Sequence, residues 1–196
     1  MKRLSVSALA LVALSAPAFA DENAAAAAAL AELAKLQAEQ ARIEQNLETF
    51  DTLDFEVFTN QEWDRLHESH AEDIVVHWPD GRTVVGLDQH IEDLSAFFVF
   101  APDTRIETHP IRIGQGEWTG VVGVIEGTFS EPMPIGDGQV IEPTGQSYKL
   151  TMATVGHWTE DGVMDEEYLF WDNNAFYRQI GLIEGSDASD RQALPP

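Results

Sequence analysis

The stretch GHWTEDGVMDEEYLFWD, residues 156–172, holds two apolar, aromatic-rich runs on either side of an Asp-Gly dipeptide. Asp161-Gly162 is a strong signal for a tight hairpin turn, so the two runs are predicted to pair as antiparallel strands. Aromatic and β-branched residues favour the pleated, half-buried surface of a sheet. This stretch therefore predicts that the C-terminal half of the chain consists of long antiparallel strands.

The hairpin also predicts which side chains share a face. A two-residue loop and a four-residue loop both pair odd-numbered residues of the first strand with even-numbered residues of the second, and opposed residues lie on one face. His157 should therefore share a face with Tyr168, Phe170 and Asp172. A carboxylate among aromatic rings is poorly solvated, which suits general acid–base catalysis. Asp172 is thus a candidate catalytic residue, although an Asp at this position can equally cap the next helix.

Helical patterns come first in the remaining chain and strand patterns follow. The predicted helices cover 60–70, 88–98 and 174–180, and the predicted extended segments cover 74–78, 83–86, 104–113, 117–129, 146–158 and 164–172. This order predicts an α+β fold in which a curved, mostly antiparallel sheet wraps around a few helices. Gly120, Gly123 and Gly127 lie within one of these strands and are interpreted as bends or bulges that let the sheet curl around a cavity.

Composition excludes several classes of function. The 196 residues include 11 Lys and Arg against 34 Asp and Glu, a net charge of −23, which opposes binding to nucleic acid or to an anionic membrane surface. A hydrophobic content of 44% is too high for a disordered acidic chain. Because the chain has no cysteine, disulfides, thiolate chemistry and cysteine-bound metals are excluded. Any catalysis must rely on carboxylates and imidazoles.

The two ends differ from the domain between them. Residues 1–20 have a basic start, a short apolar run and an Ala18-Phe19-Ala20 cleavage pattern, which predicts a signal peptide and a periplasmic or secreted protein. Residues 21–43 are predicted to form an Ala-rich helical arm, 44–184 the domain, and 185–196 a flexible tail. A heptad seam runs along the helix from Ala29 to Phe50. It indicates either a dimerising or packing helix, or a tether that is helical only where it touches the domain.

Histidines are the other candidates for chemistry. His77 and His157 each have a neighbouring Trp in a predicted strand, where a His more often has a structural role than a catalytic one. His67 and His70 lie three residues apart on a predicted helix, but no third ligand follows at a recognised spacing. They are interpreted as exposed residues, and no metal site is predicted.

Four segments together resemble a known family. HWPDG at 77–81, APDTRI at 101–106, EGTFSEPMP at 126–134 and EEYLFWDNNAFYRQIGL at 166–182 resemble the SnoaL-like polyketide cyclases, or ester cyclases, of the NTF2-like superfamily. The resemblance implies an α+β cone around an apolar pocket, a homo-oligomer that is most often a dimer, and no metal or organic cofactor. It further implies that Asp172 is the general acid/base and that His157 and His77 assist it. Trp78, Tyr168, Phe170 and Trp171 would form the pocket wall.

Two functions follow from these observations. The first is an exported, cofactor-independent acid–base enzyme acting on a small apolar carbonyl or lactone compound by cyclisation, isomerisation or hydrolysis. The alternative is a non-catalytic small-ligand-binding or assembly domain, because the export signal and the added helix are unusual for a cyclase fed by a cytoplasmic synthase. A structure with Asp172 capping a helix outside any cavity would favour the alternative. A pocket that holds Asp172 and a His together would favour the enzyme.

Overall fold

The computed structural model describes residues 16–184, with side chains from residue 22 onward. The chain divides into two compact units between Ala41 and Arg42. Helix α1 (Ala16–Thr52) provides the described part of the first unit and continues into the second. Residues 1–15 of the predicted signal peptide and the predicted tail 185–196 lie outside the described residues. Among the described helices, none is long and apolar enough to cross a membrane.

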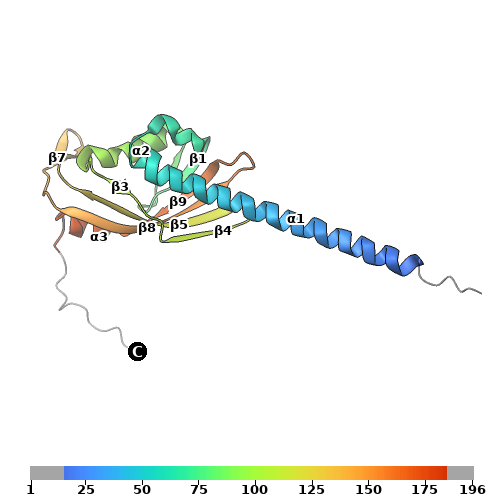
Figure 1. Cartoon of the computed structure of the whole chain (residues 1–196). Coiled ribbons are helices and arrows are strands. Elements are labelled where there is room, and N and C mark those ends of the chain that lie inside the picture. The colour runs from blue at the N-terminus through green and yellow to red at the C-terminus, as the bar shows by residue number, and fades with distance from the viewer. Residues whose placement is uncertain (1–15, 185–196) are drawn as a thin grey trace, which may run out of the picture. The chain divides into compact units, whose positions relative to one another are not determined.

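The second unit is an α+β domain in which helices lie on one face of a curved sheet (Figure 1). The sheet order is β2-β1-β9-β8-β5-β3, with β4 also paired to β5, and every pairing is antiparallel except β1 with β9. The elements are the π-helix η1 (Leu53–Phe58), the 3-10 helix η2 (Trp63–Glu68), β1 (His70–His77), β2 (Thr83–Val85), α2 (Leu87–Phe100), β3 (Arg105–Ile106), β4 (Ile111–Gln115), β5 (Trp118–Thr128), β6 (Met133–Gly136), β7 (Gln139–Ile141), β8 (Ser147–Trp158), β9 (Met164–Phe170) and α3 (Asn173–Gln179). The predicted fold class is confirmed.

The predicted helix over 60–70 is shorter than expected. Only Trp63–Glu68 is helical, and His70 already begins β1, where it pairs with Met164 of β9. This long-range pairing outweighs the local helical pattern. As a result His70 is buried rather than exposed on a helix, which corrects the sequence-based interpretation.

Two strand predictions also change. The expected strand over 104–113 is split into β3 and β4, and Pro110, which has no N–H to donate to a ladder, lies between them. The segment between β5 and β8 contains an unforeseen hairpin of β6 and β7. Its turn has positive φ at Asp137 (51°) and Gly138 (71°), as a type I′ hairpin turn requires.

The glycines of β5 make room for side chains rather than forming bulges. β5 and β8 pair without a register shift from Trp118 to Thr128, so the predicted bulges are absent from this pairing. A Cβ at Gly127 would lie 2.8 Å from the Tyr148 hydroxyl, and one at Gly123 would lie 3.5 Å from the ring of His109. A larger side chain at Gly127 would displace Tyr148, and one at Gly123 would crowd the imidazole described below.

Helix α1 uses its heptad seam in two ways. Ile43, Leu47 and Phe50 are buried in the domain core, whereas Leu33 and Leu36 are exposed. The helix is continuous from Ala16, so the structure does not support a tether that is helical only at the domain. The interpretation of this segment as a packing helix is therefore correct for the C-terminal part of the seam, which is buried in the domain core.

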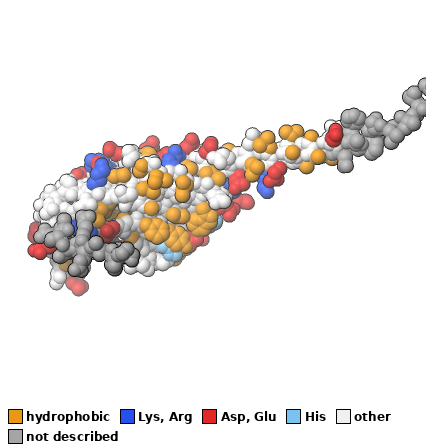
Figure 2. All heavy atoms as spheres, turned by 90° about the horizontal axis from the view of Figure 1, so that it is seen from below, with side chains coloured by type: hydrophobic (Ala, Val, Ile, Leu, Met, Phe, Trp, Pro, Cys, Tyr) orange, Lys and Arg blue, Asp and Glu red, His pale blue; other side chains and the backbone are white. Residues whose placement is uncertain are grey.

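The hairpin register confirms that His157, Tyr168 and Phe170 share a face, although the register shifts between His157 and Trp158 and Asp172 lies beyond the last pair. Val155 opposes Tyr168 and Ala153 opposes Phe170, while His157 opposes Glu166. However, this is the face of the sheet that the helices leave uncovered, here called the outer face. Hydrophobic side chains gather on it next to histidine (Figure 2). The inner face, packed against the helices, carries the even-numbered residues of β8 together with Glu167 and Leu169 of β9.

Candidate functional site

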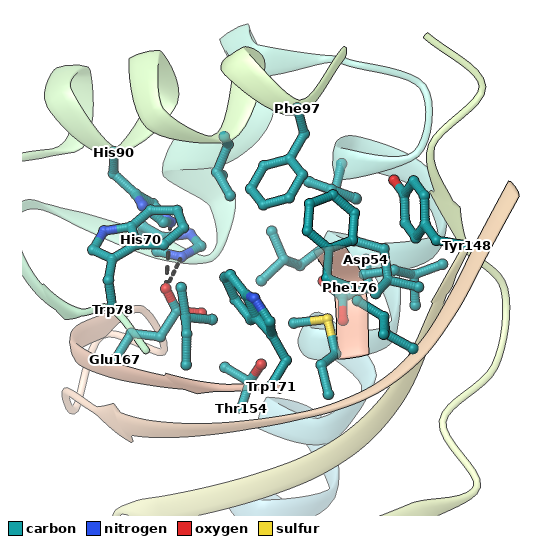
Figure 3. Close-up of a pocket in the computed structure, with 18 residues that line it drawn as sticks. Asp54, His70, Trp78, His90, Phe97, Tyr148, Thr154, Glu167, Trp171 and Phe176 are labelled. Carbon is teal, nitrogen blue, oxygen red and sulfur yellow. Dashed lines mark ion pairs between the residues drawn. The ribbon is translucent and has the colours of Figure 1, made fainter. Parts of the chain in front are cut away.

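A narrow apolar pocket lies between the inner face of the sheet and the helices (Figure 3). Its cavity volume is about 50 Å³. The walls are therefore close together, and a slender or flat molecule fits best. The lining consists of Leu53, Asp54, Phe58, His70, Trp78, His90, Leu94, Phe97, Ile106, Ile125, Tyr148, Leu150, Met152, Thr154, Glu167, Leu169, Trp171 and Phe176.

One wall of the pocket carries a cluster of three buried ionisable side chains, here called the His–Glu cluster. His70 comes from the start of β1, His90 from α2 and Glu167 from β9. Oε2 of Glu167 lies 3.3 Å from Nε2 of His90 and 3.8 Å from Nε2 of His70. All three residues are at most 4% exposed, so their charges are poorly screened by water.

Hydrogen bonds orient the two imidazoles differently. Nδ1 of His70 lies 2.8 Å from the Ser69 hydroxyl and 3.3 Å from the Leu66 carbonyl, which assigns its proton to Nδ1 and turns Nε2 toward Glu167. Nδ1 of His90 has no hydrogen-bond partner among the described residues, and neither does Nε2 of His70. The cluster thus has basic nitrogen atoms that no protein donor occupies.

The electrostatics of the cluster favour a charged carboxylate. Burial raises the pKa of Glu167, but the contacts from His70 and His90 outweigh it and lower that pKa to about 2. Burial lowers the pKa of His90 below its ordinary value of 6.5, despite the opposing effect of Glu167. At neutral pH Glu167 is therefore ionised and His90 is neutral, so His90 has a free lone pair with which to accept a proton.

The same donor set could hold a metal ion. The ligand atoms of His70, His90 and Glu167 all lie within 4.8 Å of one another. Two imidazoles and one carboxylate form a common set for divalent zinc or iron, with an open position for a substrate or water. The cluster can therefore act through its own protons or through a bound ion, and experiment can separate the two.

A second ionisable group of the pocket lies on η1. Asp54 is buried, and its Oδ2 lies 2.7 Å from Nε2 of His109. Nδ1 of His109 lies 2.7 Å from Oδ1 of Asp51, whose Oδ2 is 3.3 Å from the guanidinium of Arg112. Burial raises the pKa of Asp54, although His109 partly opposes this effect. In Figure 3, Asp54 and the His–Glu cluster appear in different parts of the pocket wall.

The structure places Asp172 outside this pocket. Its carboxylate caps α3 by accepting a hydrogen bond from the backbone N–H of Ala175 at 3.0 Å, and its side chain is 63% exposed. Of the seven sequence-predicted site residues, only Trp78 and Trp171 line the pocket. Because Asp172 caps a helix outside the pocket, its position does not support a catalytic role. An acid–base mechanism has to use the ionisable side chains on the inner face of the sheet.

The other predicted residues form a cluster of their own on the outer face. His77 stacks on Tyr168 with ring centroids 4.2 Å apart and bonds Glu166 at 3.0 Å. His157 contacts Asp165 at 2.6 Å. Phe170 is 51% exposed. The structure thus brings several of these residues together, but on the face opposite the pocket, with Asp172 not among their contacts.

Sequence signals for the missed residues existed. The hairpin parity that places His157 on one face places Glu167 on the other, between the apolar Met164 and Leu169. His90 precedes Leu94 and Phe97 by four and seven residues, which is the spacing of a buried helical stripe. No local pattern links Asp54 to His109, because their contact joins residues 55 positions apart.

Comparisons with known proteins agree with the fold. Residues 36–180 match the sequence profile of the SnoaL-like polyketide cyclases. A crystal structure described as a SnoaL-like polyketide cyclase from Jannaschia sp. CCS1 is 21% identical, with a TM-score of 0.61 over 70% of this chain and 92% of that one. IdmH from Streptomyces antibioticus, described as a polyketide cyclase, is 24% identical over 70% and 99% of the two chains, with a TM-score of 0.59.

A protein from Catenulispora acidiphila with a ketosteroid isomerase-like fold is also similar. It is 14% identical over 70% of this chain and 93% of that one, with a TM-score of 0.55. No curated protein matches the chain. At these identities the structural matches establish the fold alone.

Proposed function

Because the chain belongs to the SnoaL-like polyketide cyclase family, we propose that it is a cofactor-independent acid–base enzyme acting on a slender, largely apolar carbonyl compound. The observation that carries this proposal is the His–Glu cluster, buried in the wall of an apolar pocket. Removal of a proton next to a carbonyl needs a base in a dry site and a donor for the enolate oxygen. The cluster supplies the base in place of Asp172.

The cluster accepts the proton as a unit. Neutral His90 takes up the proton, and the carboxylate of Glu167 stabilises the imidazolium that forms. Thr154, a buried pocket residue on the inner face of β8, is our candidate donor to the enolate oxygen. In the strand register it lies diagonally across from Glu167, since Thr154 opposes Leu169 and Gly156 opposes Glu167.

Hydrogen–deuterium exchange tests the proposal without knowledge of the natural substrate. Small apolar ketones and lactones are incubated with the protein in heavy water, and NMR measures deuterium uptake at the carbon next to the carbonyl. We expect uptake by the wild type and a loss of about 10²- to 10³-fold in Glu167→Gln, because the His90 imidazolium then lacks the carboxylate that stabilises it. Glu166→Gln, on the outer face, is the matched control and should retain the wild-type rate.

Two results would contradict the proposal. If Glu167→Gln exchanges as fast as the wild type, the cluster is not the base. If the wild type binds members of the panel but exchanges none, the non-catalytic binding domain is the better interpretation.

Chelators and zinc test cofactor independence. Treatment with EDTA should leave the exchange rate unchanged. Added Zn²⁺ should inhibit, because it would occupy the same nitrogen and carboxylate atoms that accept the proton. Loss of activity with EDTA and its recovery with Zn²⁺ would instead establish a metal-dependent reaction.

We also propose that the protein self-associates through the outer face. An apolar sheet face is stabilised when another surface packs against it. The outer face carries the exposed side chains of Trp118, Ile113 and Phe170, which lie on three different strands. A second copy can supply the same face, since twofold interfaces are self-complementary. Light scattering should give a dimer for the wild type and a monomer for Phe170→Glu. A wild-type monomer would refute the proposal.

Export is the remaining part of the proposed function. It is supported by Lys2-Arg3, the apolar run after them and the Ala18-Phe19-Ala20 pattern. Bacterial expression of the full chain followed by intact-mass analysis of the periplasmic fraction should give a product that begins at Asp21. An unprocessed product in the cytoplasm would refute export.

A further inference from the structure

A second cavity, here called the side hollow, shares three aromatic residues with the pocket. Trp78, Phe97 and Trp171 line both cavities. The ring centroid of Trp171 lies 6.0 Å from that of Trp78 and 6.0 Å from that of Phe97, and both pairs meet edge to face. Figure 3 shows these three side chains around the pocket. The two cavities are therefore neighbours with a common aromatic wall.

The two cavities differ in size. The pocket has a volume of about 50 Å³, whereas the side hollow has about 230 Å³. A dry cavity of about 150 Å³ holds one benzene ring, so the pocket alone encloses only a short segment of a ligand. The rest of a longer ligand has to lie outside the pocket, and the side hollow is the adjoining space.

The charges in the side hollow oppose a charged ligand group of either sign. The guanidinium of Arg82 lies 5.2 Å from the centre of the Trp78 ring, so a protein cation already occupies that aromatic face. The same guanidinium pairs with Asp80 at 2.7 Å and with Asp93 at 3.3 Å. Hydrogen bonds from Arg82 lower the pKa of Asp80, which keeps this carboxylate ionised at neutral pH. An anion would therefore meet two carboxylates, and a cation would meet Arg82.

The side hollow nevertheless has unused hydrogen-bonding groups. Nη2 of Arg82, the hydroxyl of Tyr177 and Nδ2 of Asn173 have no hydrogen-bond partner in the described part of the chain, while Oδ1 of Asn173 accepts from the Trp171 indole at 2.7 Å. Oδ1 of Asp93 is a further acceptor, since Arg82 contacts Oδ2. A ligand hydroxyl can donate and accept at once, so a neutral group with several hydroxyls matches this mixed set.

The shared wall also has an unpaired donor. Trp78 is 6% exposed, and its indole N–H has no hydrogen-bond partner among the described residues. A buried N–H without a partner is costly, and a bound ligand can supply the acceptor. Because Trp78 lines both cavities, an oxygen atom that links the two parts of a ligand would lie beside this residue.

We propose that the side hollow is a binding subsite for a neutral, hydroxylated head group, such as a sugar ring, of a ligand whose apolar part occupies the pocket. Arg82, Asn173 and Tyr177 bind the hydroxyls, and Trp171 offers a ring against which the head group packs. The inference shares with the proposed function the entry of an apolar compound into the pocket, but it does not depend on the His–Glu cluster being a base. It narrows the substrate class to compounds with an apolar end and a polyhydroxylated end.

A series of ligands with one chain length tests the subsite in the wild type. Calorimetry compares n-hexyl β-D-glucopyranoside with hexan-1-ol, hexylamine, hexanoate and glucose. We expect the glucoside to bind at least about 10-fold more tightly than each of the others, because only it can use both cavities and each added hydrogen bond contributes modestly. Heptan-2-one should compete with the glucoside, since both chains need the pocket, and glucose should not displace heptan-2-one.

Two substitutions at exposed residues test the head-group contacts. Tyr177→Phe removes only the hydroxyl, and Arg82→Lys keeps the positive charge but loses Nη2. Each should weaken binding of the glucoside by about 3- to 10-fold and leave binding of heptan-2-one unchanged. Arg105→Lys is the matched control, because Arg105 is ion-paired and partly exposed but lines neither cavity, and it should change neither affinity.

The outcomes separate this inference from the proposed function. The inference is overturned if the glucoside binds no better than hexan-1-ol, if hexylamine or hexanoate binds more tightly, or if Tyr177→Phe and Arg82→Lys both bind the glucoside as the wild type does. Protein that exchanges deuterium into heptan-2-one but shows no preference for the glucoside would keep the proposed function and refute the subsite. Protein that prefers the glucoside but exchanges no compound would keep the subsite and refute the proposed base.

Discussion

Glu166 and Glu167 are neighbours in the chain, and each contacts imidazole, but they lie on opposite faces of β9. Glu166 meets His77 at 3.0 Å on the outer face, where its side chain is 35% exposed. Glu167 meets His90 at 3.3 Å on the inner face, where its side chain is 5% exposed. The outer pair is screened by water and its charges interact weakly. The inner pair lies in a dry pocket, where the same groups can move a proton.

The aromatic surroundings of the two faces also differ. Outside, Tyr168 and Phe170 stack in parallel, with Tyr168 half-buried and Phe170 exposed. Inside, Trp78 and Trp171 meet edge to face and enclose the pocket. Aromatic residues near a carboxylate therefore do not by themselves indicate a catalytic site. The face of the sheet on which the carboxylate lies determines whether it is enclosed in a pocket or exposed to water.

Replacing histidines on the two faces should produce the largest contrast. His90→Gln removes the nitrogen that accepts the proton, and we expect deuterium exchange into a small ketone to fall by about 10²- to 10⁴-fold. His77→Gln removes an imidazole on the outer face, and its rate should stay within about two-fold of wild type. Equal losses in the two variants would break the distinction between the faces.

Core packing gives the second contrast. Leu169 is buried and Phe170 is half exposed, although they are consecutive residues. Leu169→Ala should lower the free energy of unfolding by about 2–5 kcal/mol, as large-to-small core replacements do. Phe170→Ala should cost less than about 1 kcal/mol in dilute, monomeric protein. Urea unfolding measures both, and a larger loss for Phe170→Ala would show that the outer face is not a free surface.

Acid stability gives a third contrast. The folded pKa of Glu167, about 2, lies below its ordinary value of 4.5, so its contribution to stability is present above pH 4.5 and is lost as the pH falls toward 2. The wild type should therefore lose more thermal stability between pH 4.5 and 2 than Glu167→Gln loses. Glu166→Gln, measured in the same way, should follow the wild type closely because its carboxylate is water-screened. Parallel curves for all three proteins would contradict the pKa assigned to Glu167.

The cap of α3 should give the smallest effect. Asp172→Ala removes the side chain that accepts from Ala175, and loss of an N-cap costs about 1 kcal/mol. Because Asp172 lies outside the pocket, the exchange rate per folded molecule should be unchanged. Circular dichroism and the exchange assay measure the two quantities. A loss of activity without a loss of stability would return Asp172 to the catalytic role predicted from the sequence.

Much of the fold could be predicted from local patterns. The Asp161-Gly162 turn signal correctly predicted the hairpin. The expected pairing of odd-numbered with even-numbered residues correctly placed His157 on the same face as Tyr168. What parity cannot reveal is which face the helices cover, because that depends on contacts between distant segments. His70 illustrates this limit, since its place in β1 depends on pairing with Met164, 94 positions later. The site residues were therefore sought on a real but outward-facing surface.

The glycines and Asp54 show the same limit. Gly123 leaves space for the ring of His109, and that ring in turn links Asp51 to Asp54. Each of these residues is ordinary in its own segment. They come into contact only when η1, β5 and the segment before β4 pack together in the folded domain.

A crystal structure with a ketone or lactone selected by the exchange assay tests the central claim most directly. We predict density in the inner pocket, with the carbonyl of the compound within hydrogen-bond distance of Thr154 and the adjacent carbon next to His90 and Glu167. Density on the outer face, against Tyr168 and Phe170, with the inner pocket unfilled, would contradict it.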